Sequence, residues 1–394
     1  MNNRAEMNFI FRTIKSTFSA YPAIPTPDQE LKQLDWKELY RLANFHRIRP
    51  LLTDELTRNK SIKYPNSQPF FNFYTYQTLK NLALIVESAR LLSVFDQHSI
   101  PVLPYKGTLF IREFYPKKNI RELDDIDFLF KPESVSEAIK LLQADGYSLS
   151  VRDGPISDAE ENARILRMLA DKGKYELSMK KDKFTIDVHW DLMYYFLPYQ
   201  VEYDQFFLRA SKKPFYSTIC HVPDSETIFW MLILHHGGKE FWLRLKHLVD
   251  LMAFMNVYGA QMNWEALLLQ AKKYKLYTAV MTGFYLVNTH FSAALPPAVY
   301  EALLMFKPPN SRRIERYWAY ATHWLNVVPM LRYERICMTN QDEGFNKSRY
   351  MRQLIREHSK PNPVGRKAMV TIPERFLYTS FVYKLLSYLW RRLY

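Results

Sequence analysis

The chain is short of two features that would each assign it to a class of proteins: cysteine and long apolar runs. Its only two cysteines in 394 residues, Cys220 and Cys337, lie far apart in unrelated contexts, so neither a disulfide framework nor a cysteine-based metal site is supported. No run of about eighteen residues is apolar throughout, and the N-terminal residues lack a basic segment followed by an apolar one. We therefore expect a cytoplasmic protein without a transmembrane span.

The residues that are present indicate a globular protein whose charge is unevenly distributed. Hydrophobic residues make up 48% of the chain, enough for about two or three domains with their own cores. Residues 307–394 contain 17 Lys and Arg against 6 Asp and Glu and so contribute +11 of the net charge of +14. This region could be a solvated basic face, or it could contact nucleic acid, an acidic partner or an acidic membrane surface.

Two carboxylates one residue apart stand at the start of an apolar run. Residues 121–130 read Arg-Glu-Leu-Asp-Asp-Ile-Asp-Phe-Leu-Phe. Side chains on a β-strand alternate between faces, so Asp125 and Asp127 would share one side while Ile126 and Phe128 enter a core. Two like charges this close favour a divalent cation with oxygen ligands, and Mg²⁺ bound by carboxylates normally also holds phosphates.

Apolar periodicity predicts a mostly helical chain with a small group of strands. Helices are expected over 34–52, 70–95, 108–114, 132–144, 158–169, 227–236 and 245–252. Short strands are expected over 101–105 and 126–130, with an antiparallel pair over 175–180 and 184–189. In the last of these strands, Asp187 and His189 share the polar face.

The C-terminal region divides into two parts. Residues 341–367, with Pro361, Pro363 and Gly365, have the composition of a mobile connection. Residues 376–394 combine aromatic and basic side chains. Such a stretch could stack on bases, lie at a membrane interface, or form an amphipathic helix docked on the body or on a second subunit.

A Lys-Gly turn, then Asp-Ile-Asp on a strand, then Ile-Asp-Val-His-Trp on a later strand resembles the uncharacterised bacterial nucleotidyltransferase family, a branch of the polymerase-β-like superfamily. The segment 42–52, Leu-Ala-Asn-Phe-His-Arg-Ile-Arg-Pro-Leu-Leu, is similar to the N-terminal helical signature of that family. His236, Arg244 and residues 248–251 resemble its second, helical part. The resemblance covers roughly residues 30–260 and finds no counterpart for the basic C-terminal region.

The resemblance implies an α+β fold, in which a mixed nucleotidyltransferase sheet with flanking helices is embedded in a largely α-helical chain. It makes Asp125 and Asp127 paired ligands of Mg²⁺ or Mn²⁺ and Asp187 the third carboxylate, which could share an ion and act as general base. It places Lys106, Gly107 and Thr108 at the triphosphate of an NTP, with ATP as the default. All three aspartates would then be catalytic, since metal neutralises the charge that develops at an α-phosphate.

The chain departs from the superfamily pattern at two positions. The turn usually reads Gly-Gly or Gly-Ser, whereas this chain has Lys106 followed by Gly107. Asp124 stands where the family often has glycine and adds a negative charge beside the expected metal site.

Other polar residues are candidates for lining the nucleotide cleft. His189, His236, Arg244 and Asp250 could lie there. His235, His236, His247 and Asp250 could also gather around a metal, but contacts between helix faces explain them better.

These features favour one function over two alternatives. The leading hypothesis is metal-dependent transfer of an NMP from an NTP to an acceptor hydroxyl on a small molecule, a protein or an RNA end, with release of pyrophosphate. A catalytically inactive module that binds nucleotide or nucleic acid is the first alternative. A glycosyltransferase with an Asp-Xaa-Asp motif is less favoured, because the preceding hundred or so residues have a helical pattern where that class needs strand-helix units.

Four regions are expected along the chain. They are an N-terminal helical region (1–98), the catalytic core (99–222), a helical domain lining the nucleotide cleft (223–306) and a basic, aromatic-rich helical region (307–394).

Overall fold

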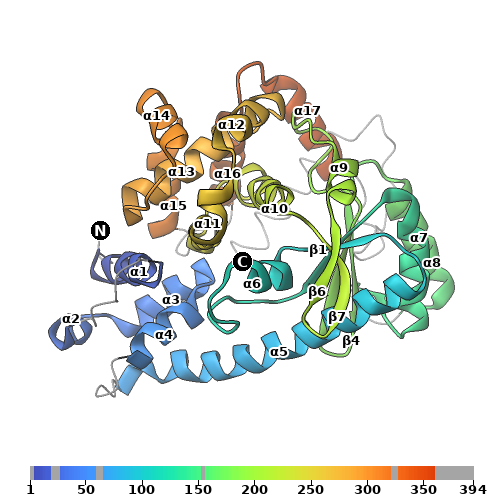
Figure 1. Cartoon of the computed structure of the whole chain (residues 1–394), viewed down its shortest axis with the longest axis horizontal. Coiled ribbons are helices and arrows are strands. Elements are labelled where there is room, and N and C mark those ends of the chain that lie inside the picture. Colours follow the sequence, from blue (N-terminus) through green and yellow to red (C-terminus); the bar gives the residue numbers. More distant parts are fainter. Residues whose placement is uncertain (1–3, 19–26, 59–64, 152–155, 321–326, 360–394) are drawn as a thin grey trace.

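The protein has an α+β fold in which a mixed β-sheet lies beside a large helical part (Figure 1). The computed structural model describes residues 4–18, 27–58, 65–151, 156–320 and 327–359. The predicted fold class is confirmed: strands and helices are mixed, and helices dominate.

The helices before the sheet form the N-terminal side of the molecule. They are α1 (Arg4–Thr17), α2 (Asp28–Lys32), α3 (Trp36–His46), α4 (Arg49–Arg58) and, after a 3₁₀ turn at Pro65–Ser67, the 30-residue α5 (Gln68–Gln97). The helical prediction over 34–52 is confirmed with one interruption. Arg47 adopts a left-handed conformation, φ 57°, which ends α3 before α4 begins with Pro50 in its first turn.

The main sheet has five strands in the order β1-β2-β5-β4-β3. The strands are β1 (Val102–Tyr105), β2 (Ile126–Phe130), β3 (Ser148–Leu149), β4 (Glu176–Lys181) and β5 (Phe184–His189). All four predicted strands are confirmed, and β1 lies at the edge, where Pro104 costs no ladder hydrogen bond. Only β2 and β5 pair in parallel, which sets Asp127 directly beside Asp187.

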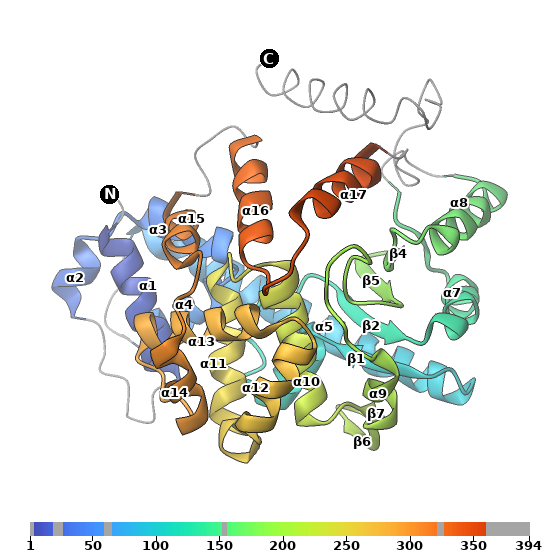
Figure 2. The same ribbon diagram turned by 90° about the horizontal axis from the view of Figure 1, so that it is seen from above.

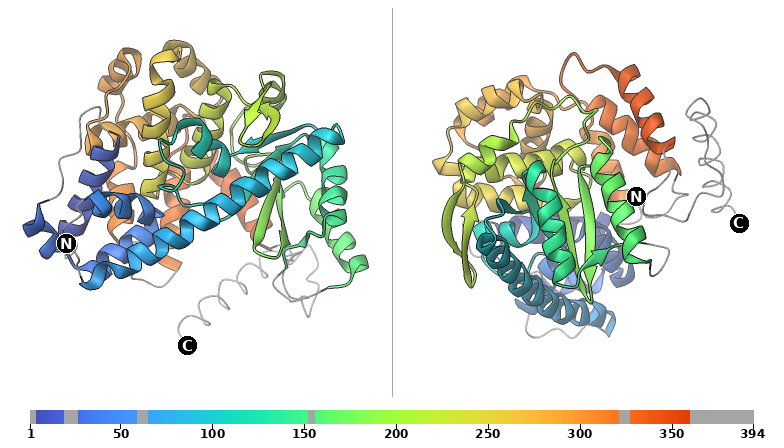
Figure 3. Two further views of the ribbon diagram at one scale, coloured as in Figure 1. Left: turned by 60° about the horizontal axis from the view of Figure 1, so that its bottom comes forward. Right: turned by 90° about the vertical axis from the view of Figure 1, so that its right-hand side faces the viewer.

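The sheet face opposite the carboxylates packs on α5. Phe95 of this helix makes edge-on ring contacts with Phe128 at 5.8 Å and Phe130 at 5.1 Å. The alternation predicted for β2 therefore holds, with aromatic side chains on the core side. The same helix continues past the sheet to α4, so it spans both parts of the molecule (Figure 3).

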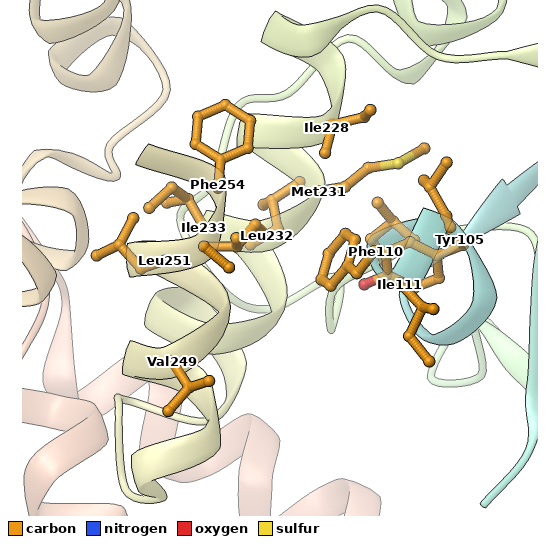
Figure 4. Close-up of a cluster of buried hydrophobic side chains, with 14 of the residues drawn as sticks. Tyr105, Phe110, Ile111, Ile228, Met231, Leu232, Ile233, Val249, Leu251 and Phe254 are labelled. Atoms are coloured by element: carbon orange, nitrogen blue, oxygen red, sulfur yellow. The ribbon is translucent and has the colours of Figure 1, made fainter. Parts of the chain in front are cut away.

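Helices α6 (Gly107–Phe114), α7 (Val135–Ala144) and α8 (Asp158–Ala170) connect the strands. The predicted helix over 132–144 begins with a 3₁₀ turn at Pro132–Ser134 and continues as α7. On its far side, α6 packs against the helical part. Figure 4 shows Phe110 of α6 facing Met231 of the helical part, so apolar packing supports the start of α6 and the turn before it.

A hairpin and a second group of helices follow the sheet. They are α9 (Tyr203–Leu208), β6 (Ser211–Phe215), β7 (Thr218–Val222), α10 (Ser225–Leu232), a π-helix (Ile233–Lys239), α11 (Leu245–Tyr258), a 3₁₀ turn (Gly259–Gln261), α12 (Trp264–Lys273), α13 (Tyr277–Phe291) and α14 (Pro297–Met305). The helix predicted over 227–236 is confirmed, but its last turns widen into the π-helix.

Helices α15 (Ser311–Tyr320), α16 (Val327–Thr339) and α17 (Lys347–Ser359) lie over the top of the helical part in Figure 2. The interpretation of 341–367 as a mobile connection is wrong for its first half, which contains α17. Asn346 caps this helix by accepting the N–H of Arg349 at 2.8 Å, and Tyr350 is buried. Residues 376–394 lie outside the described residues.

One hydrophobic core unites the parts of the chain that the structure describes. Its buried side chains run from Phe9 in α1 through the sheet to Trp318 in α15 and Tyr350 in α17, and so come from all four predicted regions. The boundaries of those regions stay a prediction. In the described part of the chain, no helix has the length and apolarity needed to cross a membrane.

Candidate active site

Three side chains converge on the sheet face where β2 and β5 run side by side. Asp127 and Asp187 occupy paired positions of these strands. Together with His189 they offer ligand atoms that all lie within 4.8 Å of one another. Asp125 precedes β2 by one residue and interacts electrostatically with both aspartates. The structure thus brings together all three predicted carboxylates, and it adds His189 to the closest group.

The Lys-Gly turn places a positive charge on these carboxylates. Lys106 has φ 47°, a backbone conformation that glycine adopts at no cost and that strains other residues by about 1–3 kcal/mol. Its Nζ lies 2.7 Å from Oδ1 of Asp127. A glycine would avoid the strain but could not make this ion pair.

Gly107 begins α6 beside the same carboxylate. A Cβ at this position would lie 3.6 Å from the carbonyl oxygen of Asp125 and 3.8 Å from Oδ2 of Asp127. The N-terminus of α6 therefore faces the site, where its dipole and free N–H groups favour an anion. Thr108 turns away: its hydroxyl lies 3.2 Å from that of Ser88 in the core.

His189 lies between two carboxylates. Its Nε2 is 3.1 Å from Oδ1 of Asp127, and its Nδ1 is 3.1 Å from Oε2 of Glu176 on β4. Burial alone lowers the pKa of His189, but the two carboxylates outweigh it and raise that pKa. His189 therefore orients Asp127 and compensates its charge.

The aspartates differ in how readily they ionise. Burial, then the charges of Asp127 and Asp187, raises the pKa of Asp125 to about 7. Burial and the charge of Asp127 also raise the pKa of Asp187, which accepts a 2.6 Å hydrogen bond from Ser178. For Asp127, burial is outweighed by Lys106 and His189, which lower its pKa to about 2. A cation would relieve the repulsion that raises the first two values.

The loop before β2 is held by ion pairs from both sides. Arg121 binds Asp250 of α11 through two contacts of 2.8 and 2.9 Å. Glu122, buried, binds Arg49 of α4 at 2.7 Å. These contacts fix the segment that ends at Asp125.

The negative charge of Asp124, the second departure noted in the sequence, is compensated by residues other than those around Asp125, Asp127 and Asp187. It pairs with Arg47 at 2.5 Å and with Lys80 of α5 at 2.9 Å. These two cations hold the pKa of Asp124 below its ordinary value against the opposing effect of burial. Its charge therefore serves to attach the loop to the N-terminal helices.

A cleft of about 230 Å³ opens beside the carboxylates and is walled by α11 and the π-helix. Asp125, Asp127, Lys106 and Gly107 line it on one side, and His235, His236, His247, Arg244 and Lys246 on the other. Arg244 and Lys246 have no acidic partner within 4 Å among the described residues. Burial, then the charge of Arg121, lowers the pKa of Lys246 to about 8. The cleft thus offers an anion two cations that make no close ion pair, although Glu240 also lines it.

Asp250 lies behind this wall and does not line the cleft. It is fully buried and, besides Arg121, accepts hydrogen bonds from Tyr115 at 2.5 Å and from His236 at 2.8 Å. These bonds hold α11 and the π-helix against the loop that carries Asp125.

The sequence model of one protein family, described as uncharacterised nucleotidyltransferase, matches residues 32–292. The chain belongs to this family. The matched range holds every residue of the carboxylate group and of the cleft wall, whereas α15–α17 lie beyond it. No protein among the curated ones matches the chain.

The donor set of this family member fits a divalent metal ion. Carboxylate oxygens are the ligands that Mg²⁺ and Mn²⁺ prefer, and three aspartates face one another across two strands. Burial, then the charge of neighbouring aspartates, raises the pKa of Asp125 and Asp187, and a bound cation would favour their ionised forms.

The sequence does not predict the roles of several residues in and around the cleft. Arg121 stands four residues before Asp125 and Lys246 two residues after Arg244, yet neither spacing shows that the two side chains face each other. Glu176 is visible only as a polar residue of an alternating strand. Their roles depend on how α11 and β4 pack, which no local pattern contains.

Proposed function

We propose that the protein is a metal-dependent nucleotidyltransferase that moves an NMP from an NTP to an acceptor hydroxyl and releases pyrophosphate. One observation carries this proposal: Asp125, Asp127 and Asp187 gather on one face of the sheet, across a cleft from the cations Arg244 and Lys246. The first group suits a divalent cation, and the second suits the phosphates that accompany it.

The chemistry assigns a part to each side of the cleft. Asp125, Asp127 and Asp187 would hold Mg²⁺ or Mn²⁺, which neutralises charge on the phosphates. Lys106, the N-terminus of α6 and the two cations of α11 bind and orient the triphosphate. The acceptor oxygen forms a bond to the α-phosphorus, the bond from that phosphorus to the bridging oxygen breaks, and pyrophosphate leaves.

The alternatives differ in what supports them. A DxD glycosyltransferase is disfavoured, because helices α1–α5 precede the sheet where that class has strand-helix units. A module that binds nucleotide without turnover has the same cleft and is separated by the assay below. Four further points stay predictions. They are the use of ATP as the NTP, the class of acceptor, the cytoplasmic location, and a contact of residues 307–394 with nucleic acid, an acidic partner or a membrane surface.

The proposal is tested by pyrophosphate release. The protein is incubated with labelled NTPs, Mg²⁺ or Mn²⁺, and total small RNA or cell extract as the source of acceptor. Asp127→Asn and Asp187→Asn should each slow release about 100-fold or more, since metal-ion stabilisation of the transition state contributes several kcal/mol. Asp182→Asn is the matched control, because Asp182 is an exposed residue of the β4–β5 turn.

Two results would contradict the proposal. One is release from the Asp127→Asn and Asp187→Asn variants at the rate of the wild type. The other is the absence of release and of a labelled acceptor with every NTP, while the protein still binds the nucleotide, which would establish the non-catalytic alternative.

A further inference from the structure

Two consecutive histidines lie on the π-helix at the wall of the cleft. His236 is fully buried, and its Nε2 lies 2.8 Å from Oδ2 of Asp250. Its Nδ1 lies 2.9 Å from Nδ1 of His235, which lines the cleft with Asp125 and Asp127. The wide turn of a π-helix brings the neighbouring rings this close, and such turns are frequent at functional sites.

The hydrogen bonds determine where the protons of both rings are. The ionised Asp250 cannot donate, so His236 donates from Nε2. Burial lowers the pKa of His236 and keeps the ring neutral, so its Nδ1 is an acceptor. His235 must therefore donate from Nδ1, which leaves the lone pair of its Nε2 free. Among the described residues, this Nε2 has no hydrogen-bond partner.

We propose that His235 accepts the proton of the attacking hydroxyl through Nε2, and that His236 and Asp250 hold it in the tautomer that can do so. The inference rests on the proposed nucleotidyltransfer and adds the residue that activates the acceptor. Asp250 and His236 are positioning residues, since neither reaches the reacting atoms.

The proton inventory balances along this chain of hydrogen bonds. The acceptor O–H gives its proton to Nε2 of His235 while its oxygen bonds to the α-phosphorus. The proton on Nδ1 of His235 moves to Nδ1 of His236, so the positive charge comes to rest beside the carboxylate of Asp250. After pyrophosphate leaves, the proton returns by the same route to solvent in the cleft.

The cations around His235 explain why it would pass a proton on to His236. Lys106 faces it from the β1–α6 turn, Lys239 and His236 from its own π-helix, and His247 from α11. Burial, then the charge of Lys106, holds the pKa of His235 well below its ordinary value, so the ring is neutral at pH 7. An imidazolium there would face two lysines, and passing the charge to His236 avoids this.

Asp187 is the competing base, and its contacts suit it less. It accepts a hydrogen bond from Ser178 and belongs to the group that would hold metal. A carboxylate whose lone pairs are engaged by a hydroxyl and a cation is a poor proton acceptor. His235 lies on the opposite wall, with its lone pair open to the cleft.

Chemical modification tests the assignment of the tautomer without any turnover. Diethyl pyrocarbonate attacks unprotonated imidazole nitrogens. Mass spectrometry of the full chain at pH 7 should show carbethoxylation at His235 faster than at His236 or His247, and ATP with Mn²⁺ should slow it about tenfold. Modification of His235 no faster than of His236 would overturn the proposed open lone pair.

Turnover tests the role itself. Under the pyrophosphate assay with ATP, Mn²⁺ and small RNA or extract, His235→Gln should lower kcat about 100-fold or more, the usual contribution of a general base. The KM for ATP should stay within about threefold, and the fall in kcat/KM at low pH should then reflect only the site carboxylates. Imidazole added to His235→Ala should restore part of the rate, which a purely structural role would not allow. His98→Gln is the matched control, because His98 is an exposed histidine at the end of α5.

Failure of the proposed function and failure of the role assigned to His235 give different results. If wild type releases no pyrophosphate, the proposed function fails and this inference falls with it. If wild type releases pyrophosphate and His235→Gln does so at the same rate and with the same pH profile, the nucleotidyltransferase stands and His235 is not its proton acceptor.

Discussion

At the residue scale, the ammonium of Lys106 lies beside Asp127, where a metal ion bound by that carboxylate would also place positive charge. Its ammonium lies 2.7 Å from Asp127, and the carboxylates raise its pKa, so it is charged at neutral pH. A cation that binds Asp127 must compete with it. In Lys106→Met, Mn²⁺ should bind at least tenfold tighter without nucleotide. Unit charges about 4 Å apart interact by about 4 kcal/mol at an effective dielectric constant of about 20, and about 1.4 kcal/mol already corresponds to a factor of ten. Titration of Mn²⁺ followed by electron paramagnetic resonance measures this.

The same variant should bind ATP more weakly, because the lysine also faces the phosphates. Lys181→Met is the control, since Lys181 pairs with Asp145 away from the cleft. Weaker or unchanged Mn²⁺ binding in Lys106→Met would show that the ammonium does not compete for Asp127.

A residue of the site can be predicted when a local sequence pattern determines its position, and not when its position depends on contacts between distant elements. Alternation on a strand predicts that Asp125 and Asp127 share a side. Only the family resemblance implies that Asp187 joins them, because the parallel pairing of β2 with β5 has no local sequence signal. Lys106 follows from its place before Gly107. The hydrogen bonds of His235 do not follow, because a π-helix has no sequence pattern comparable to the 3.6-residue period.

At the element scale, a buried histidine joins three helices. Nδ1 of His46, at the end of α3, accepts the N–H of Leu245 at the start of α11. Its Nε2 donates to the carbonyl of Trp318 in α15 at 3.2 Å. Only the neutral ring can make both bonds. Burial lowers the pKa of His46 to about 3, so the ring is neutral at pH 7 and can make both bonds.

This histidine makes stability depend on pH. Between about pH 6.5 and 3 the unfolded chain binds a proton at His46 that the folded chain does not, so stability is lost as pH falls through this window. From pH 7 to pH 5 this single group removes about 2 kcal/mol of the free energy of unfolding. Urea unfolding of wild type and His46→Gln at both values tests it, because Gln can accept and donate but cannot titrate.

The comparison isolates His46 from other titrating groups, which are the same in both proteins. The free energy of unfolding of His46→Gln should fall less on acidification, by about 2 kcal/mol. Equal losses in the two proteins would show that His46 is already protonated in the folded state.

Elements with strong periodicity are predictable, and those set by contacts are not. The β4–β5 pair alternates over both strands, and the sequence predicts it fully. The break between α3 and α4 depends on Arg47 turning left-handed to reach Asp124, a contact 77 positions away in the chain. Helix α17 escapes prediction because the prolines and glycine that follow it dominate the composition of 341–367.

At the scale of the whole molecule, the N-terminal helices and the sheet act as one unit. A single core runs through both, and the ion pair of Arg49 with Glu122 crosses between them. Arg49 also lies with its Cζ 3.3 Å from the ring centroid of Phe73. The helical signature around residues 42–52 thus has a structural reason to accompany the Asp-Xaa-Asp strand, since it holds the loop that leads into that strand.

This link predicts coupled unfolding, and a double-mutant cycle tests it. Arg49→Met should cost about 3 kcal/mol, because it leaves buried Glu122 with only Arg47 at 3.9 Å and the backbone N–H of residue 49. Arg49→Met/Glu122→Met should recover part of that loss. Hydrogen exchange should show amides of α3 and β2 losing protection by equal amounts in Arg49→Met, because both belong to one cooperative unit. Loss of protection in α3 alone would mean that the N-terminal helices unfold independently, so that the strand that carries Asp127 does not depend on them.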